Sequence, residues 1–379
     1  MKRILLVTSK SPTLSEDFDG GSVLVSQLCD FLPSISYLDI LLLRKPVDII
    51  KYYPKVKNII TLEPIYASEC RFTNRLLNAD RTCRHIKKIY KNYEKIFIVH
   101  ISNSFGIEKL DPPVRSKIVL FPMFTGESYL RSGEVVPTSY INEELKAINS
   151  VERISSPSRA EIKQLVTTYK VNPKNILLHP RGIDFNVFPA QSRTPPKPQE
   201  KLSIAYVAAI RPQKNQIETI QIIAELKKRG FKPVLHIIGG IGCYMYYKNL
   251  SSILHKCNCV ENYVFHGAVS QMECSRIISQ CHFGISVSKW ETFGKGLFEG
   301  LATGLPSFAY EHLECLWEYL PSNSGIKLLP SNPYSIPNEI EYLMQNPSIY
   351  KSMAVSAIND VRGLNAGFSI NKMVNELVF

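Results

Sequence analysis

Long apolar runs and paired cysteines are both missing from this sequence of 379 residues. No apolar run approaches the roughly 20 residues that a membrane-spanning helix needs, and ILLV at 4–7 is too short for the core of a signal peptide. The nine cysteines form no C-x-x-C pair, and Cys257 and Cys259 lack a second ligand pair at zinc spacing. Reduced thiols and the absence of a leader indicate a reducing compartment, so we expect a cytoplasmic protein.

Motifs for dinucleotide and nucleic-acid binding are also missing. The first expected strand is not followed by the fingerprint G-x-G-x-x-G, which argues against a nicotinamide cofactor. No RNA- or DNA-binding motif accompanies the net charge of +12, and a basic composition alone is weak evidence for such a partner. We therefore expect no nucleic-acid partner.

The positive charge is densest in residues 71–95, which hold eight basic and two acidic residues. Ile86, Ile89, Tyr90 and Tyr93 recur at helical spacing, so one face of the expected helix is apolar. One interpretation is a surface helix that packs these residues on a sheet and leaves its basic face in solvent. The other is a docking face for an anionic membrane, to which each surface cation contributes about 1 kcal/mol.

The length and the order of elements favour two α/β domains. An apolar content of 45% in 379 residues suffices for two cores, in domains of about 190 residues each. Apolar strands that alternate with helices are typical of a parallel, doubly wound sheet. We expect such Rossmann-like domains at 1–188 and 201–364, joined by a proline-rich linker at 189–200. The first half is expected to contain strands at 2–9, 38–43, 57–62, 95–101, 117–122, 151–156 and 175–180.

The segment ETFGKGLFE, from Glu291 to Glu299, places two carboxylates eight positions apart. It joins an expected buried strand at 282–290 to an expected helix at 295–304. The backbone N–H groups of residues 294–297 would lie at the positive end of that helix, where phosphate binds readily. A diphosphate between the carboxylates would put one hydroxyl-rich group at each, as in a nucleotide sugar. A solvated pair of glutamates around an ordinary loop has the same spacing.

Five segments, one at the expected domain junction and four in the second half, resemble in order and spacing the retaining GT-B glycosyltransferases of family 4. The last of them carries the E-x7-E motif of that family, whereas the first half of the chain matches more loosely. The resemblance implies two Rossmann-like domains that face each other across a cleft, with a C-terminal helix at 365–379 that crosses back to the N-domain. The segments are HPRGIDFNVF at 179–188, IAYVAAIRPQKNQ at 204–216, LHIIGG at 235–240, VFHGAVS at 264–270 and SKWETFGKGLFEGLATGLP at 288–306.

The resemblance also implies a donor site. Lys214 matches the phosphate lysine of the family, and Arg211 lies near the family's arginine position, which here holds Ala209. Gly20 and Gly21 are similar to glycines through which the N-domain backbone approaches the donor diphosphate or the acceptor. We expect Glu291, Lys214 and Arg211 to be catalytic, with Glu291 at the transferred sugar and Glu299 at the ribose. The remaining candidate donor-binding residues are Phe293, Gly294, Lys295, Gly296 and Leu297.

A retaining transfer in this family needs no protein nucleophile, because the departing diphosphate can accept the proton of the acceptor hydroxyl. The protein then stabilises the charge that builds on the diphosphate and positions both substrates. Cations and a helix end suit this task, so we expect no metal and no other cofactor. Asp17 and Asp19 form a D-x-D pair, but they follow the first strand, the wrong place for a metal site. A turn or an acceptor contact is the expected role.

The acceptor side is less defined. Many family members have a histidine after the strand at 117–124, where this sequence has Met123. His100, at the end of the strand at 95–101, and Glu127 are therefore the acceptor-side candidates. The family's acceptors are often lipid-linked, which fits the second interpretation of the basic segment.

The expected function is retaining transfer of a hexose-type sugar from a UDP- or GDP-linked donor to a hydroxyl of a glycan or lipid-linked acceptor. The resemblance implies bacterial surface-polysaccharide biosynthesis by a cytoplasmic enzyme, and peripheral contact with the inner face of the cytoplasmic membrane is compatible with that role. One alternative is a nucleotide-sugar 2-epimerase, although its acid and base residues cannot be assigned here. The other is a non-catalytic nucleotide-sugar-binding protein, which Ala209 and Met123 make conceivable.

Overall fold

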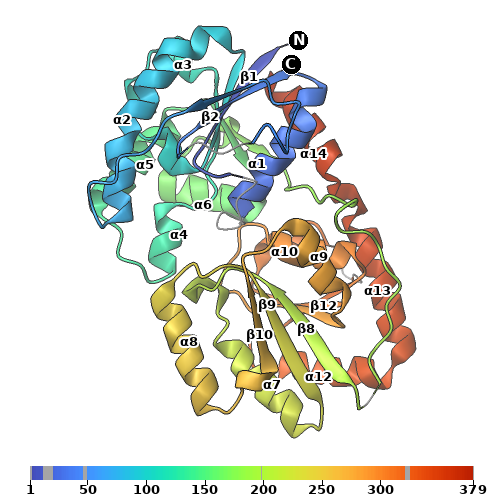
Figure 1. The fold of residues 1–379 in the computed structure, drawn as a ribbon. Coiled ribbons are helices and arrows are strands. Elements are labelled where there is room, and N and C mark those ends of the chain that lie inside the picture. Colours follow the sequence, from blue (N-terminus) through green and yellow to red (C-terminus); the bar gives the residue numbers. More distant parts are fainter. Residues whose placement is uncertain (1, 12–19, 46–48, 198, 321–324, 379) are drawn as a thin grey trace. The chain divides into compact units, whose positions relative to one another are not determined.

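The computed structural model describes residues 2–11, 20–45, 49–197, 199–320 and 325–378. The chain divides into two compact units (Figure 1). Unit 1 comprises Met1–Arg181 and Gly367–Phe379, and unit 2 comprises Gly182–Ala366. The stretch 189–200, which we expected to be a linker, belongs to unit 2 by this division. The reason is that the buried side chain of Arg193 donates to the carbonyl oxygens of Ile278, Ser279, Cys281 and Thr303.

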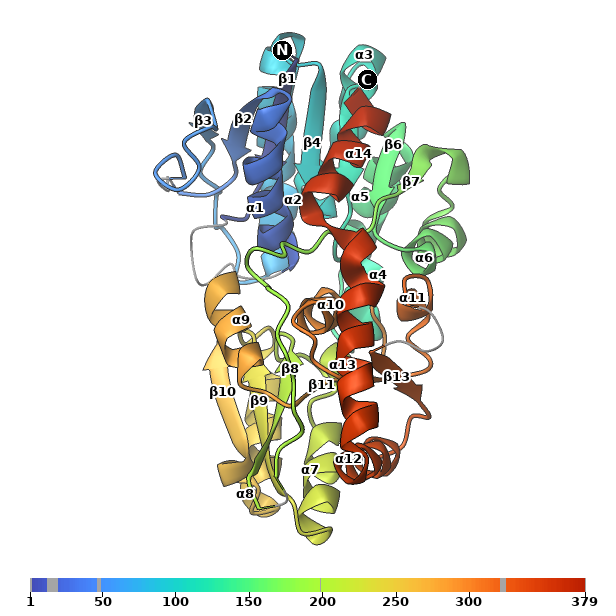
Figure 2. The same ribbon diagram turned by 90° about the vertical axis from the view of Figure 1, so that its right-hand side faces the viewer.

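Unit 1 contains a seven-stranded parallel sheet in the order β3-β2-β1-β4-β5-β6-β7, which Figure 2 shows from β3 to β7. Its central strands are apolar on both faces, as a parallel sheet covered by helices requires. The expected strands of this half are confirmed with ends shifted by a few residues. The strands are β1 (Arg3–Thr8), β2 (Tyr37–Leu42), β3 (Asn58–Thr61), β4 (Lys95–Val99), β5 (Ile118–Phe121), β6 (Arg153–Ser156) and β7 (Ile176–Leu178).

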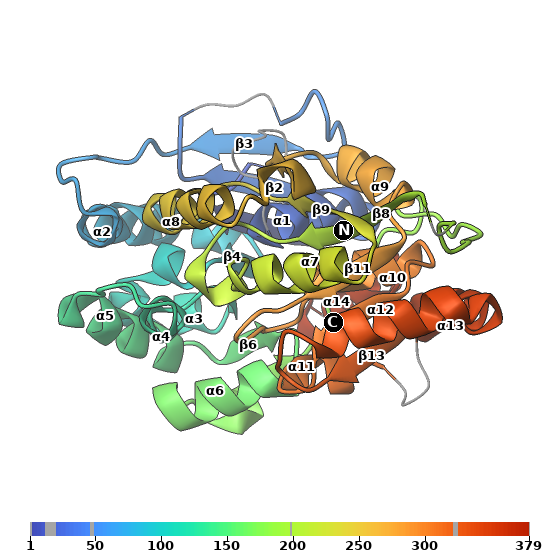
Figure 3. The same ribbon diagram turned by 90° about the horizontal axis from the view of Figure 1, so that it is seen from below.

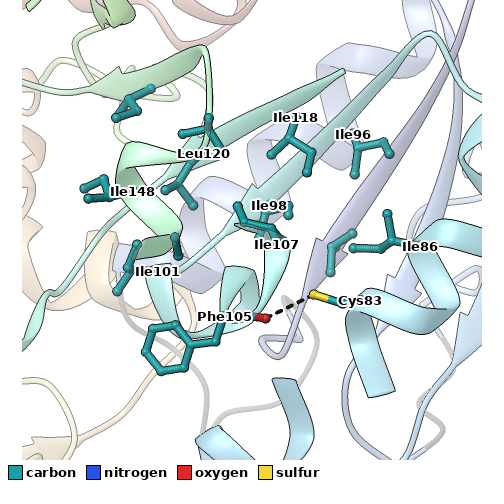
Figure 4. Packing of buried hydrophobic residues seen from close by; sticks show 14 of the residues in the cluster. Cys83, Ile86, Ile96, Ile98, Ile101, Phe105, Ile107, Ile118, Leu120 and Ile148 are labelled. Carbon is teal, nitrogen blue, oxygen red and sulfur yellow. Dashed lines mark hydrogen bonds between the residues drawn. The ribbon is translucent and has the colours of Figure 1, made fainter. Parts of the chain in front are cut away.

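Helices cover both faces of this sheet because successive strand residues point to opposite sides. Leu5 and Val7 of β1 join a core with α2, α5 and α6. Figure 4 shows part of this core, in which the Cys83 thiol donates to the carbonyl oxygen of Phe105 at 3.1 Å. Ile4 and Leu6 face a second core with α1 and the C-terminal α14. The helices of unit 1 are α1 (Gly20–Phe31), α2 (Arg71–Ile89), α3 (Pro112–Arg115), α4 (Gly126–Arg131), α5 (Thr138–Asn149) and α6 (Arg159–Tyr169), with α14 (Ala366–Val378) starting at the last residue of unit 2.

Unit 2 contains a six-stranded parallel sheet in the order β10-β9-β8-β11-β12-β13. Helix α12 lies between α7 and α13 on one side of the unit (Figure 3). The strands are β8 (Lys201–Val207), β9 (Lys232–Ile238), β10 (Tyr263–Gly267), β11 (Phe283–Ser286), β12 (Ser307–Tyr310) and β13 (Ile326–Leu329). The helices are α7 (Glu218–Lys228), α8 (Tyr244–Lys256), α9 (Gln271–Ser279), α10 (Lys295–Ala302), α11 (Glu314–Trp317), α12 (Ser335–Gln345) and α13 (Pro347–Val361).

The strand order of unit 2 reverses between β8 and β11, which are neighbours. From β8 the chain runs outward to β9 and β10, then returns to β11 and continues to β12 and β13. Open parallel sheets bind ligands outside the carboxyl ends of their strands at such a reversal. The loops after β8 and β11 are therefore the first place to look for a site, and they carry Lys214 and Glu291.

Candidate functional site

Lys214 and Glu291 meet at the carboxyl ends of β8 and β11. The ammonium nitrogen of Lys214 lies 2.5 Å from Oε1 of Glu291, and the Ser288 hydroxyl donates to the same oxygen at 2.7 Å. The side chains are only 19% and 9% exposed, so water screens this ion pair weakly. The hydroxyl of Tyr206, in β8, donates to the carbonyl oxygen of Lys214 and lies 3.1 Å from the Ser288 hydroxyl. Hydrogen bonds of Tyr206 therefore connect β8 with the segment after β11, next to the ion pair.

The amino terminus of α10 is pressed against the end of β8. A Cβ atom on Gly296 would lie 2.6 Å from the carbonyl oxygen of Val207, so this close approach requires glycine. Gly294 precedes the helix with a φ of 81°, in the left-handed region. The N–H of Leu297 donates to the carbonyl oxygen of Gly294 at 3.0 Å, so one of the four expected phosphate-facing amides is already engaged. Among the described residues, no acceptor is found for the N–H groups of Lys295 and Gly296, which suit an anion.

The side chains of Phe293 and Leu297 are buried, at 3% and 8% exposure. The ring of Phe293 stacks on Phe298 at a centroid distance of 4.7 Å and contacts Tyr319 edge-on. These side chains anchor the turn in the core. Of the donor-binding roles that we expected for Phe293 and Leu297, only backbone contacts suit this arrangement.

Glu299 is buried within the second turn of α10, at 6% exposure. Its Oε1 accepts from Nε2 of Gln271, at the start of α9, at 3.1 Å and lies 3.3 Å from the ammonium nitrogen of Lys295. Lys295 also donates to the carbonyl oxygen of Gly182 at 2.7 Å. Lys295, the cation expected in this turn, is thus held between Glu299 and Gly182, the first residue of unit 2.

Arg211 lies in the loop after β8, with its side chain along the loop after β9. A Cβ atom on Gly242 would lie 2.1 Å from Nε of Arg211, so the two loops touch at this point. Ala209, at the family's arginine position, offers its carbonyl oxygen to Nε2 of Gln216 at 2.9 Å. Lys214, rather than Arg211, is the expected cation that the described structure brings to Glu291.

Two residues with positive φ lie at the carboxyl ends of β4 and β5 in unit 1. They are His100, with a φ of 79°, and Met123, with a φ of 62°. Such backbone strain in residues other than glycine is concentrated at functional sites. Nδ1 of His100 accepts from the N–H of Ser102 at 3.4 Å. Glu127 instead pairs with Arg131, one turn further along the short helix α4, at 3.0 Å, in a surface arrangement of small energetic weight.

The glycines expected near the donor form the first turn of α1. A Cβ atom on Gly20 would meet no atom of the described residues within 4 Å, so packing against them does not require glycine at that position. Asp17 and Asp19 lie outside the described residues. Among the residues that the structure does describe, no three His, Cys, Asp or Glu side chains form a group that could hold a metal ion.

Arg181, beside Met123, and Glu161 are buried charged residues that were not found from the sequence. Nη2 of Arg181 lies 3.5 Å from the sulfur of Met123, and its guanidinium lies 5.7 Å from the ring centre of Phe121. Burial raises the pKa of Glu161 to about 7, against the opposing effects of Arg181 and of the Ser156 hydroxyl. The spacing of Ser158 and Glu161 is that of a helix capping box, so the sequence signals a structural glutamate rather than a site.

Residues 187–360 match the family model described as Glycosyl transferases group 1. No curated protein sequence matches the chain. Among solved structures, sucrose-phosphate synthase from Thermosynechococcus elongatus is 14% identical, with a TM-score of 0.81 and coverage of 100% of this chain and 99% of that chain.

Two further structures share the fold over almost the full length. HepE from Anabaena, in complex with UDP and glucose, is 13% identical with a TM-score of 0.76, over 100% of this chain and 99% of that chain. WaaG, a glycosyltransferase involved in lipopolysaccharide biosynthesis, is 11% identical with a TM-score of 0.72, over 99% of each chain. Two Rossmann-like parallel-sheet domains of the GT-B type confirm the expected fold class. Residues 187–360 carry a Glycosyl transferases group 1 domain on this fold, and the chain is therefore a glycosyltransferase.

Proposed function

We propose that the protein is a retaining glycosyltransferase of family 4 that transfers a hexose-type sugar from a nucleotide diphosphate sugar to an acceptor hydroxyl. The observation that carries this proposal is the Lys214–Glu291 ion pair, which lies at the strand-order reversal. The backbone N–H groups of Lys295 and Gly296, for which no acceptor is found among the described residues, follow at the start of α10. A cation, a carboxylate and a helix end are together suited to a sugar diphosphate.

In this proposal each group binds one part of the donor. Lys214 and the N–H groups of Lys295 and Gly296 hold the diphosphate, with Arg211 as a further cation. Glu291 accepts hydrogen bonds from the transferred sugar, and Glu299 accepts them from the ribose. Gly20 and Gly21 let the backbone of the first turn of α1 approach the donor diphosphate or the acceptor. UDP-linked donors are the first choice, because HepE is described in complex with UDP and with UDP-glucose.

The transfer breaks the bond between the sugar's anomeric carbon and the diphosphate oxygen. The acceptor oxygen forms its bond to the same carbon on the same face, and its proton passes to the departing diphosphate. Lys214 stabilises the negative charge that grows on the diphosphate, while Glu291 orients both the sugar and Lys214. Cations and backbone amides therefore supply the charge stabilisation without a metal ion. Activity in excess EDTA tests this point, since full loss that Mg²⁺ or Mn²⁺ restores contradicts it.

His100 is the proposed acceptor-side residue of unit 1. Its backbone has a positive φ directly after β4, a strain that is typical of functional sites. Glu127 is the weaker candidate, since Arg131 already pairs with it. The acceptor is a glycan or a lipid-linked sugar in surface-polysaccharide biosynthesis. That pathway is supported by the fold shared with WaaG, a glycosyltransferase involved in lipopolysaccharide biosynthesis.

Peripheral contact with an anionic membrane, on its cytoplasmic face, is the second part of the proposal. Ile86 and Tyr93 are buried in the core of unit 1, so the apolar face of the basic segment packs on the protein. Contact with lipid then depends on charge. Lys91 also lines a groove of about 610 Å³ together with three more cations and one acid, Lys2, Arg3, Lys117 and Glu94. None of the described helices is long and apolar enough to span a bilayer.

Incubation of the pure protein with radiolabelled UDP- and GDP-sugars tests the function. Slow hydrolysis of the donor, reduced to a low but measurable rate in a Glu291→Gln variant, is the expected result for a transferase. Formation of a 2-epimer indicates the isomerase instead. Binding of the donor without turnover, by a protein that a cooperative melting transition shows to be folded, indicates the non-catalytic alternative. A thermal-shift screen of donors then identifies the preferred base and sugar.

A further inference from the structure

His312 links the end of β12 to the loop that carries Glu291. It is an exposed histidine two residues beyond β12. Its Nε2 lies 2.9 Å from the carbonyl oxygen of Ser288, and its Nδ1 lies 2.8 Å from the hydroxyl of Ser331, which follows β13. Three neighbouring strand ends are therefore joined through one imidazole ring.

The chemistry of these partners fixes the tautomer. A carbonyl oxygen can only accept a hydrogen bond, so Nε2 of His312 carries the proton and donates. In the neutral ring Nδ1 has no hydrogen and accepts from the Ser331 hydroxyl. Both ring nitrogens are engaged by the protein, which leaves neither available as a proton shuttle to a substrate.

We infer that His312 is a positioning residue for the Lys214–Glu291 pair, an assignment that rests on the function proposed above. His312 holds the backbone of Ser288, the hydroxyl of Ser288 holds Oε1 of Glu291, and that oxygen holds Lys214. Each link is a single hydrogen bond or ion pair between described atoms. Loss of the first link leaves the peptide between Ser288 and Lys289 with one hydrogen bond, from the Lys289 N–H to the carbonyl oxygen of Gln213 at 2.8 Å, and so loosens the support of the carboxylate.

The test uses three substitutions with different hydrogen-bonding groups. His312→Gln keeps an N–H donor near the former Nε2, whereas His312→Ala and His312→Asn remove it. His312→Ala and His312→Asn should lower kcat for donor hydrolysis or transfer about tenfold, the scale of one lost hydrogen bond. His312→Gln should keep most of the wild-type kcat. His255→Ala, which alters another exposed histidine of the same unit, is the control.

A double-mutant cycle separates positioning from simple destabilisation. In a Glu291→Gln background, His312→Ala should lower kcat no further, because the group that His312 positions is already lost. Three results each overturn the inference. They are a loss in the double variant equal to the product of the two single losses, an unchanged kcat in His312→Ala, and a His312→Gln variant as slow as His312→Ala. A reduced kcat of Glu291→Gln relative to the wild type, with an independent effect of His312→Ala in both backgrounds, would leave the proposed function standing and remove only His312 from it.

A second readout works without turnover. The ¹⁵N chemical shifts of the His312 ring at a pH where it is neutral should show a protonated Nε2 and an unprotonated Nδ1. Ser331→Ala should leave Nε2 protonated, because the Ser288 carbonyl still requires a donor. A ring protonated at Nδ1 contradicts the hydrogen bond to Ser288 and the inference with it, whatever sugar the enzyme uses.

Discussion

Lys214 and Glu291 stand 77 positions apart in the sequence and form a partly buried ion pair across two neighbouring strand ends. Removal of Lys214 leaves the carboxylate of Glu291 without its cation, close to the expected diphosphate. The loss should therefore exceed that of one attractive contact, because an uncompensated negative charge remains.

We predict that Lys214→Ala weakens binding of a nucleoside diphosphate by more than the roughly 1–3 kcal/mol of a single charged hydrogen bond. Binding of the monophosphate should change much less. Lys214→Ala with Glu291→Gln should recover part of the diphosphate affinity but none of the turnover. Isothermal titration calorimetry with both nucleotides measures the difference. Equal losses for the two nucleotides would contradict a diphosphate role, and Arg211→Ala is judged by the same comparison.

Gly296 and Gly300 offer a matched pair on α10. A Cβ atom on Gly296 would lie 2.6 Å from a backbone oxygen of β8, whereas one on Gly300 would lie 3.5 Å from the nearest atom, a carbon of Leu305. Gly296→Ala should therefore push the start of the helix off β8, weaken nucleotide binding and lower the melting temperature. Gly300→Ala should preserve nucleotide binding. The proposal for the helix end fails if both variants bind nucleotide like the wild type.

Glu299→Ala should weaken binding of nucleoside mono- and diphosphates alike, by about 1–3 kcal/mol, because the ribose is common to both. Glu273→Ala serves as the control, since Glu273 lies on the adjacent α9 and pairs with Arg276 at the surface. Calorimetric titration with UMP and with UDP gives the measurement. Unchanged affinity and rate in a folded Glu299→Ala protein would exclude the ribose role.

Binding to anionic vesicles should depend on the exposed cations of the basic segment. Arg84, Lys87, Lys88 and Lys91 are to be neutralised together, and co-sedimentation compared with the wild type. Binding should rise with the fraction of anionic lipid and fall with salt, because salt shortens the range of the attraction. Arg75 is excluded because it donates to the hydroxyls of Tyr129 and Tyr140 within the protein. If the wild type and the variant co-sediment with anionic vesicles to the same extent, the basic segment is only a solvated face of the helix.

The buried carboxyl of Glu161 should make stability depend on pH. Its pKa is raised from 4.5 to about 7 in the folded protein, so the folded state binds more protons than the unfolded state between these values. Its contribution to stability is therefore present below about pH 4.5 and lost as the pH rises through 7. Glu161→Gln should gain stability relative to the wild type between pH 5 and 8. Urea denaturation at several pH values measures this difference, and a constant offset would contradict the shift.

The sequence predicted the fold class and the local setting of the two carboxylates. Apolar runs such as ILLV at 4–7 marked the strands, because parallel strands covered on both faces need unbroken hydrophobic sequence. The change from a strand pattern to a helical pattern between Glu291 and Glu299 located the start of α10. Both signals are local in the chain, so no knowledge of tertiary packing was needed.

The partners of the site residues could not be predicted, because they depend on contacts distant in sequence. The Ser288 hydroxyl on Glu291, the bond from Lys295 to the Gly182 carbonyl and the burial of Phe293 all follow from how strand ends and loops pack. The apolar spacing of the basic segment was similarly ambiguous. A helix that packs on a sheet and a helix that lies on a membrane have the same period.

Unit 2 is an insertion into unit 1, since the chain enters it at Gly182 and leaves it at Ala366. Its two ends are joined by a parallel bridge between Ile183 and Asn365, with the Ala366 N–H donating to the Ile183 carbonyl oxygen at 2.9 Å. During synthesis, unit 2 can therefore close as soon as its own residues have left the ribosome. Unit 1 must wait for α14, whose Ile370 and Val374 complete the core against Ile4 and Leu6. The first half of the protein to be translated is thus the last to be finished.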